Sequence, residues 1–295
     1  MSALPPAVEP DAALARLTTI GTGGPARFLA RPASAPELEA VLAWADADQL
    51  DVAVVGLGSN LLVADEGYDG VAVHLEGALA AIEIDGTSVR CGGGASLAAV
   101  VRRASDAALA GIEFGCAIPG TVGGAVRMNA GAYGSEIRDV LRSAEVVSAT
   151  GTRRGGPAEL ELSYRHSNVR ASEVVAEAVL ELESGIRDEI RERVKAMQRR
   201  RSESQPRKAR TFGSVFKNPD EGPGAGALIE ACGLKGHVIG GARISTVHAN
   251  FIENTGNASS ADVAALVALA RRSVREQFGV ALEHEVELLG PVSLV

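Results

Sequence analysis

Apolar residues recur with the spacing of a helix in several stretches of the chain. The clearest of these is residues 260–278. Ser259 or Ser260 can cap its first turn, and Asp262 lies within that turn. Gly279 follows the last apolar position, as is common where a helix ends. Helices are predicted over residues 36–48, 96–110, 187–201, 225–231 and 260–278. Ser96 is a possible cap of the second of these.

Short apolar runs between turn residues predict strands. The Asp85-Gly86 turn divides one run into a hairpin. In the last run, Glu283, Glu285 and Glu287 share one face, because alternate residues of a strand point the same way. Such a row of acids is typical of the solvent-exposed side of an edge strand. Strands are predicted over residues 26–30, 51–55, 71–75, 81–91, 143–149, 173–183, 238–244, 250–253 and 280–289.

Glycine gathers in two stretches, of which the longer is residues 111–134. Glycine admits positive φ and close approach of a ligand, and unpaired backbone N–H groups bind anions. This stretch therefore fits the surroundings of a large, flat cofactor with a pyrophosphate. A buried, glycine-rich turn between two packing elements explains the same pattern, so both interpretations stay open at this point.

The second stretch, Gly56–Val63, follows a predicted strand and begins like a dinucleotide-binding fingerprint. Leu61 stands where that fingerprint has its third glycine, and the residues after it are typical of a strand and a turn rather than a helix. We therefore exclude a Rossmann motif. The glycines, the Ser59 hydroxyl and the Asn60 amide still offer donors for a different phosphate loop.

Composition narrows the class of protein. The 295 residues are 46% hydrophobic but only 3% aromatic, which predicts aliphatic cores in a chain long enough for two domains. A formal net charge of −8 argues against nucleic-acid binding. We find no secretory signal and no apolar run of membrane-spanning length. The three cysteines are too far apart for a disulfide framework or a metal site, so we expect a reduced, cytoplasmic setting.

Few other side chains indicate chemistry on their own. The five histidines are scattered, which argues against a bound metal, and Ser214 lacks the closing glycine of a hydrolase nucleophile elbow. Arg165 follows Tyr164 in a region poor in charge, although an exposed surface arginine is the commoner explanation. The basic residues at 199–201, 207, 208 and 210 are typical of a solvated helix end, with phosphate binding as the minor alternative.

Together, five segments resemble the UDP-N-acetylenolpyruvoylglucosamine reductase family, flavoenzymes of bacterial peptidoglycan precursor synthesis. The segments follow the family's order and cover nearly the whole chain. Each is weak alone, and the combination is specific. The segments are GLGSNLLV (56–63), IPGTVGGA (118–125) with MNAGAYG (128–134), SYR (163–165), GSVFKNP (213–219) and LEHEVELLG (282–290).

The resemblance implies an α+β fold. It consists of a two-subdomain FAD-binding module of the PCMH/vanillyl-alcohol-oxidase type, a C-terminal α+β substrate domain, and a last strand that returns to the FAD module. We expect the FAD-binding module over residues 1–206, with subdomains of about 1–76 and 77–206. The substrate domain would then cover residues 207–279 and the returning strand residues 280–295.

The resemblance also implies site residues. Arg165, Ser214 and Glu285 match the family's catalytic trio. FAD, held without a covalent bond, would contact Gly56, Leu57, Gly58, Ser59, Asn60, Leu61, Ile118, Pro119, Gly120, Thr121, Gly123, Gly124 and Ala125. The candidates for substrate binding are Tyr164, Asn218, Lys235, His248 and Asn250.

The implied reaction reduces UDP-N-acetylglucosamine-enolpyruvate to UDP-N-acetylmuramate with NADPH. Reduced FAD supplies a hydride from N5. Arg165 and a protonated Glu285 would stabilise the enolate, and the Ser214 hydroxyl would protonate its carbon. An enolate carbon is basic enough to take a proton from a hydroxyl, so the reaction needs no histidine.

Two departures from the family pattern keep the residues small or away from the ligand, so we expect FAD binding to survive them. Leu57 stands where many members have glycine, and Cys116-Ala117 stands where Ser-Gly is common. Between Arg165 and Ser214 there is no room for the Tyr-bearing loop of one subclass. The chain therefore resembles the subclass without that loop.

Two other functions fit the same segments. One is an FAD-linked oxidase or dehydrogenase of another small hydroxy acid or sugar, which would ignore the enolpyruvyl sugar nucleotide. The other is a non-catalytic sugar-nucleotide-binding protein, which would be colourless. We expect the sugar nucleotide and NADPH as partners of a monomer that binds neither nucleic acid nor membrane.

Overall fold

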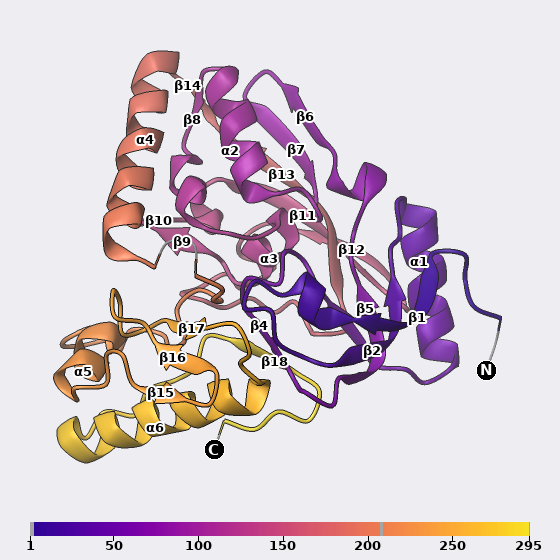
Figure 1. The fold of residues 1–295 in the computed structure, drawn as a ribbon. Coiled ribbons are helices and arrows are strands. Elements are labelled where there is room, and N and C mark those ends of the chain that lie inside the picture. Colours follow the sequence, from indigo (N-terminus) through magenta and orange to yellow (C-terminus); the bar gives the residue numbers. More distant parts are fainter. Residues whose placement is uncertain (1–2, 207–208, 295) are drawn as a thin grey trace. The chain divides into compact units, whose positions relative to one another are not determined.

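The computed structural model describes residues 3–206 and 209–294 (Figure 1). The chain divides into two compact units. Unit 1 contains the described residues up to Pro10, Phe28–Leu57 and Gly70–Arg201. Unit 2 contains Asp11–Arg27, Gly58–Asp69 and the described residues from Ser202 onward. Arg207 and Lys208, where we expect a domain boundary and part of a basic run, lie outside the described residues, and the domain limits remain a prediction.

The larger layer of unit 1 is a five-stranded antiparallel sheet of order β12-β11-β13-β7-β6. The predicted turn at Asp85-Gly86 joins β6 to β7, and Gly86 adopts a φ of 58° there. Figure 1 shows α2 (Leu97–Asp106) lying along this sheet, and its buried face is aliphatic. The strands are β6 (Ile82–Asp85), β7 (Ser88–Gly92), β11 (Leu141–Ser148), β12 (Gly151–Gly155) and β13 (Val174–Glu181).

The second core of unit 1 packs α1 (Ala35–Ala47) against the parallel pair β3 (Val52–Val54) and β5 (Tyr68–Val73). These strands belong to a sheet of order β1-β2-β5-β3, with β1 at Val8–Ala13 and β2 at Pro25–Ala30. Other elements between the N-terminus and Ser204 are η1 (Leu14–Leu17), η2 (Gly77–Ala80), η3 (Glu113–Ala117), η4 (Ile137–Asp139), α3 (Val122–Arg127), α4 (Arg187–Ser204), β8 (Leu109–Ala110), β9 (Gly131–Ala132), β10 (Ser135–Glu136) and β14 (Glu183–Ser184).

Unit 2 is built on a three-stranded antiparallel sheet of order β15-β16-β17 that packs with α5 and α6 around an aliphatic core containing two buried phenylalanines, Phe212 and Phe216. A separate parallel pair joins β4 (Leu61–Val63) to β18 (Glu287–Leu289). The end of the chain therefore pairs with a strand from its first quarter. The other elements are α5 (Ala225–Ala231), α6 (Ser260–Phe278), β15 (Val238–Ile239), β16 (Ala242–Ile244) and β17 (Ile252–Asn254).

Both ends of α6 form as predicted. The Ser259 hydroxyl accepts a hydrogen bond from the Asp262 backbone N–H, and the Asp262 carboxylate accepts one from the Ser259 N–H, both at 3.0 Å. This reciprocal pair is a capping box, which satisfies N–H groups that the first turn leaves unpaired. Gly279 ends the helix with a left-handed φ of 71°.

The predicted strand over residues 280–289 is wrong for most of its length, because only Glu287–Leu289 forms a strand. The residues before it extend along Phe216, which forms an isolated antiparallel bridge with His284. Other elements also differ from prediction. Helix α2 ends at Asp106, where Leu109–Ala110 pairs as β8, and α4 continues to Ser204. The strand predicted over residues 238–244 forms two strands, β15 and β16, and Ser96 makes no side-chain cap.

Candidate functional site

The two predicted phosphate loops meet within unit 1. Gly56 and Leu57 follow β3, and Ile118–Ala125 leads into α3. Thr121 caps α3 by accepting a hydrogen bond from the Gly124 N–H at 3.3 Å. A Cβ added to Gly56 would lie 2.7 Å from the Thr121 hydroxyl oxygen, so a side chain at position 56 would push the loops apart.

Backbone N–H groups at this meeting point remain available to a ligand. Within the described parts of the chain, those of Gly56, Leu57, Gly120 and Thr121 donate no hydrogen bond. Clustered, unpaired N–H groups form anion sites. These donors therefore fit the pyrophosphate of FAD, and they come from both stretches in which the sequence predicts cofactor contacts.

The remainder of the first loop, Gly58–Leu61, belongs to unit 2. Gly58 has a φ of 61°, and a Cβ there would lie 1.9 Å from the Leu17 carbonyl oxygen. Its own carbonyl accepts hydrogen bonds from the Thr19 N–H and hydroxyl at 3.1 and 3.2 Å. The tight contact explains why this position is glycine. Leu61 begins the strand β4 rather than a helix, which agrees with the exclusion of a Rossmann motif.

Arg165 lies on the unit 1 segment between β12 and β13 in a strained conformation. Its φ of 54° is left-handed, which is costly for a residue with a side chain. Its Nη2 donates to the Gly131 carbonyl at 2.9 Å, and its guanidinium carbon lies 5.0 Å from the centre of the Tyr164 ring. The structure thus brings Arg165 and Tyr164 together and joins them to the MNAGAYG segment.

Asn129 fixes this arrangement from a fully buried position. Its Nδ2 donates to the Ser163 carbonyl and to the Glu136 carboxylate, both at 2.9 Å, and its Oδ1 accepts from the Arg138 N–H at 3.0 Å. Asn129 also has a positive φ, of 39°. Strained residues persist where the surroundings over-determine them, often at functional sites.

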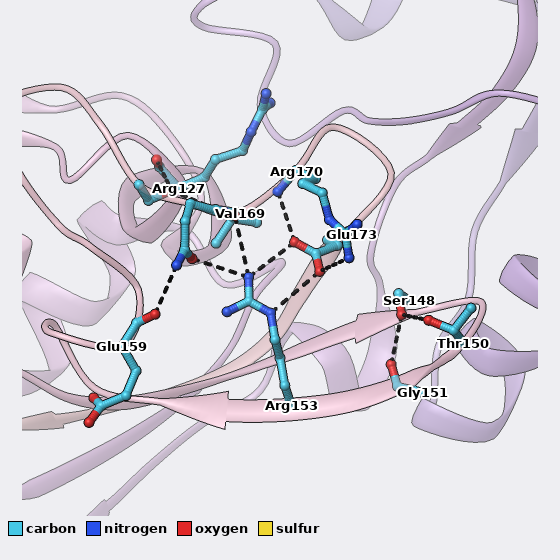
Figure 2. A network of polar contacts seen from close by, with 11 residues as sticks. Arg127, Ser148, Thr150, Gly151, Arg153, Glu159, Val169, Arg170 and Glu173 are labelled. Atoms are coloured by element: carbon cyan, nitrogen blue, oxygen red, sulfur yellow. Dashed lines mark hydrogen bonds and ion pairs between the residues drawn. The ribbon is translucent and has the colours of Figure 1, made fainter.

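A second network holds the C-terminal end of the same segment (Figure 2). The buried Glu173 carboxylate receives hydrogen bonds from the Arg153 side chain at 3.0 Å and from the Arg170 N–H and side chain at 2.8 and 3.1 Å. Burial alone would raise the pKa of Glu173, but these hydrogen bonds outweigh it and lower the pKa to about 2. Glu173 is therefore an anion at neutral pH and ties the segment to β12.

Ser214 and Glu285 lie on neighbouring segments of unit 2. The Glu285 N–H donates to the Val215 carbonyl at 2.8 Å, one residue beyond Ser214. The Asn60 Nδ2 donates to the Glu285 carbonyl at 3.0 Å, and the Gly213 N–H donates to the Ser59 carbonyl at 3.0 Å. One side-chain and one backbone hydrogen bond therefore join the end of the first glycine loop to both predicted catalytic segments.

Comparison with known proteins identifies the family. A model of the FAD-binding domain matches residues 26–154, and a model of the UDP-N-acetylenolpyruvoylglucosamine reductase C-terminal domain matches residues 205–289. The UDP-N-acetylenolpyruvoylglucosamine reductase of Sphingopyxis alaskensis is 43% identical over 96% of this chain and 95% of its own. That of Paramagnetospirillum magneticum is 44% identical over 95% of this chain and 91% of its own. The chain belongs to the UDP-N-acetylenolpyruvoylglucosamine reductase family.

The fold agrees with that family. The solved UDP-N-acetylenolpyruvylglucosamine reductase of Thermus caldophilus is 37% identical and superposes with a TM-score of 0.84, covering 96% of this chain and 99% of its own. A glucose dehydrogenase, Phl p 4.0202, shares the fold over 63% of this chain and 43% of its own, at 14% identity and a TM-score of 0.50. The predicted fold class, an α+β chain with an FAD-binding module of the PCMH type, is confirmed.

Unit 2 carries four of the five residues that we expect to bind the substrate of this reductase-family chain, namely Asn218, Lys235, His248 and Asn250. The fifth, Tyr164, belongs to unit 1. Lys235 pairs with Glu230 at 2.8 Å. The pKa of His248 is lowered, mainly because the ring is buried and to a smaller extent because Lys235 is positively charged. The Asn218 Oδ1 accepts a hydrogen bond from the Ala225 N–H at 3.1 Å, at the start of α5. None of these contacts tests a role in binding, which remains a prediction.

Asn250, the fourth of them, is almost wholly buried, with 3% of its surface exposed. Its Oδ1 accepts from the Phe216 N–H at 3.0 Å and its Nδ2 donates to the Phe216 carbonyl at 2.8 Å. The side chain thus contacts the segment that carries Ser214. Arg165 belongs to unit 1, whereas Ser214 and Glu285 belong to unit 2, so the convergence of the reductase trio on one flavin remains a prediction.

Sequence reasoning did not find Asn129, Glu173 or the contacts of Asn250. Asn129 and Asn250 each bond residues 34 positions away, and Glu173 bonds Arg153 across 20 positions. No local pattern reveals such partners. The only available signal was the position of Asn129 inside one of the family segments.

Among the described residues, no group of three or more His, Cys, Asp or Glu side chains could hold a metal, and no helix is both long and apolar enough to cross a membrane.

Proposed function

We propose that this chain reduces the enolpyruvyl ether of UDP-N-acetylglucosamine-enolpyruvate to UDP-N-acetylmuramate, with NADPH as the reductant, in peptidoglycan precursor synthesis and hence cell wall biogenesis. The observation that carries the proposal is identity above 40% to curated reductases over nearly the full length of both chains. The match of an FAD-binding domain and the unused N–H groups of the glycine loops support FAD as a non-covalent cofactor.

The protein's part in the reaction begins with the substrate carboxylate. When bound, reduced FAD supplies a hydride from N5 to the terminal carbon of the enolpyruvyl double bond. Negative charge then develops on the carboxylate as an enolate. We assign its stabilisation to the Arg165 guanidinium and to a hydrogen bond from protonated Glu285. Arg165 is suited to this because its strained backbone and its bond to Gly131 fix the side chain before substrate arrives.

Ser214 completes the reduction by donating its hydroxyl proton to the carbon next to the carboxylate. The hydride and the proton together convert the double bond to a single bond, and the resulting alkoxide recovers a proton from solvent. In the described residues, the Ser214 hydroxyl makes no hydrogen bond, so it is available to a ligand. The backbone groups of its two neighbours, Gly213 and Val215, are hydrogen-bonded, which favours a fixed direction of proton transfer from the Ser214 hydroxyl.

The nucleotide part of the substrate is assigned to unit 2. Lys235 offers a positive charge for a phosphate, because it is paired with a single exposed acid, Glu230, that a diphosphate can replace. Asn218 and His248 offer polar groups, and Tyr164 of unit 1 offers an exposed aromatic ring.

We further propose that the protein is cytoplasmic and monomeric. Size-exclusion chromatography with light scattering tests the monomeric state.

A steady-state assay tests the reaction against its two alternatives. Purified protein should be yellow, release FAD on acid denaturation, and consume NADPH in proportion to added enolpyruvyl sugar nucleotide. Mass spectrometry should find a product two hydrogens heavier than the substrate. NADPH consumption that depends on oxygen and ignores the sugar nucleotide would favour the oxidase. A colourless protein that binds the sugar nucleotide without FAD would favour the non-catalytic alternative.

A further inference from the structure

Asn250 makes more contacts with the Ser214 segment than any nucleotide role requires. Its backbone carbonyl accepts from the Val215 N–H at 2.9 Å, and its side-chain amide bonds both the N–H and the carbonyl of Phe216. We propose that Asn250 is a positioning residue that holds Ser214 for proton transfer, rather than a ligand of the nucleotide. This inference rests on the proposed function, because it presumes that Ser214 donates the proton.

The geometry of Asn250 imitates a strand partner. A neighbouring strand would offer Phe216 one acceptor and one donor, and the primary amide of asparagine offers the same two groups. Both groups are buried, with Asn250 at 3% and Phe216 at 2% exposure, so water cannot replace them. Residues 213–219 form no regular strand, and the Asn250 amide supplies the pairing that a strand would otherwise provide.

The other edge of the same segment faces Glu285. The Glu285 N–H donates to the Val215 carbonyl at 2.8 Å, and the Lys217 N–H donates to the Glu283 carbonyl at 2.9 Å. Asn250 on one edge and residues 283–285 on the other therefore enclose Val215–Lys217. The Gly213 N–H is bonded to the Ser59 carbonyl, so the backbone is fixed on both sides of Ser214 while its hydroxyl stays uncommitted.

Fixing the backbone matters because proton transfer depends steeply on geometry. A displacement of about 1 Å at a reacting group can cost on the order of 100-fold in rate. Loss of the Asn250 amide leaves two buried backbone groups of Phe216 unpaired, and the segment can satisfy them only by shifting toward water. The shift moves Ser214 relative to the Ser59 and Glu285 segments, which contact its two neighbours.

A positioning role and a nucleotide-binding role predict different kinetics. A residue that binds UDP changes KM for the sugar nucleotide, whereas a residue that orients Ser214 changes the rate of proton transfer. Reduction of the flavin by NADPH depends on neither the binding of UDP nor proton transfer from Ser214. The ratio of the two half-reactions therefore separates the positioning role from a general loss of stability, which would affect both.

The test uses holoenzyme variants Asn250→Ala and Asn250→Asp, with Asn254→Ala as the matched control. Asp keeps the acceptor for the Phe216 N–H but loses the donor to its carbonyl. Asn254 is also a buried asparagine of unit 2, bonded through its side chain to Ile20, Gly256 and Ala258. Rapid mixing measures flavin reduction by NADPH and reoxidation by the sugar nucleotide, and amide hydrogen exchange follows residues 213–217 without substrate.

For Asn250→Ala we expect unchanged flavin reduction, reoxidation slowed about 10–100-fold, KM for the sugar nucleotide within about threefold, and at least about tenfold faster exchange at the Phe216 amide. Asn250→Asp should fall between this variant and the wild type, and it decides the question if Asn250→Ala does not fold. Asn254→Ala should leave the ratio of the half-reactions unchanged.

Wild-type reoxidation rates in both Asn250 variants, or an effect confined to KM, would overturn the inference while leaving the proposed function intact. Equal slowing of both half-reactions in Asn250→Ala and Asn254→Ala would also overturn it. Failure of the wild-type protein to be reoxidised by the sugar nucleotide would instead refute the proposed function.

Discussion

The Arg165 neighbourhood in unit 1 and the Ser214–Glu285 neighbourhood in unit 2 are held by different forces. Around Arg165, an anionic carboxylate, arginine side chains and residues with positive φ fix a long irregular segment. Around Ser214, backbone hydrogen bonds and the neutral amide of Asn250 fix a short extended segment. The first site thus adds a charged support, Glu173, to the neutral amide of Asn129, whereas the second site rests on neutral supports.

The difference indicates how each neighbourhood responds to its surroundings. Charged supports titrate, so the Arg165 segment depends on pH through Glu173. Neutral supports do not titrate, but they leave buried unpaired groups when one partner is removed. The Arg165 segment should therefore be most sensitive to acid, and the Ser214 segment to loss of single hydrogen-bond partners.

The largest expected effect is at Ser214. Ser214→Ala should leave flavin reduction by NADPH unchanged and slow reoxidation by the sugar nucleotide about 10²–10⁴-fold, as expected for loss of a proton donor. The backbone around Ser214 is bonded through its neighbours, so alanine should not move the segment. Rapid-mixing absorbance measures both steps, and near-normal reoxidation would remove Ser214 from the mechanism.

Glu285 gives the next largest effect and has a natural control two residues away. Glu285→Ala should slow reoxidation about 10²–10³-fold, and Glu285→Gln should be milder because its amide still donates a hydrogen bond. Glu283→Ala should be nearly silent, since the Glu283 side chain is 77% exposed. Equal and small effects of these three substitutions on kcat would show that the segment is only a solvated edge.

Glu173 tests the charged supports of unit 1 through stability. Its pKa falls from an ordinary 4.5 to about 2 on folding, so the folded state binds protons less readily. Its contribution, about 3 kcal/mol, is present above pH of about 4.5 and disappears as the pH falls toward 2. Glu173→Gln should lose this stability at neutral pH. The free energy of unfolding, measured with urea, should then fall less steeply as the pH is lowered than it does in the wild type.

Glu145→Gln is the control for that experiment. Glu145 pairs with Arg154 at 2.9 Å in a more exposed ion pair, so its loss should cost about 0.5 kcal/mol. If the free energy of unfolding falls equally steeply with decreasing pH in the wild type and in Glu173→Gln, the anion does not support the segment. The contrast between the units would then fail.

The smallest effect is expected at Lys235, which pairs with Glu230. Lys235→Ala should raise KM for the sugar nucleotide about tenfold, by loss of one charge-assisted contact to a phosphate, and leave flavin reduction by NADPH unchanged. The control Lys195→Ala removes a lysine that pairs with Glu192 on the exposed part of α4. An unchanged KM in Lys235→Ala would withdraw Lys235 from the nucleotide site.

Local sequence patterns predict the elements whose signals lie within a few residues. The cap of α6 depends on Ser259 and Asp262, three positions apart, and the β6–β7 turn on adjacent Asp85 and Gly86. Residues 280–289 fail the same test, because alternating acids show only that a segment is extended. Whether it forms a strand depends on partners more than 60 positions away, such as Phe216 and Leu61.

The candidate site shows the same limit. The glycine loops were predictable because their own backbone performs the role, as at Gly56 and Gly58. Asn129, Glu173 and Asn250 act through residues distant in sequence, and their side chains alone are typical of any polar surface position. Only folding reveals that each is buried and bonded to a segment that carries a predicted catalytic residue.

The most direct test of the reductase function is an anaerobic experiment in two additions. NADPH is added first to the yellow protein, and the enolpyruvyl sugar nucleotide second, while the flavin absorbance is followed. We expect bleaching after the first addition and full recovery of the yellow colour after the second, without oxygen. Recovery only after air is admitted would contradict the proposed function, because it would show that oxygen and not the sugar nucleotide accepts the electrons.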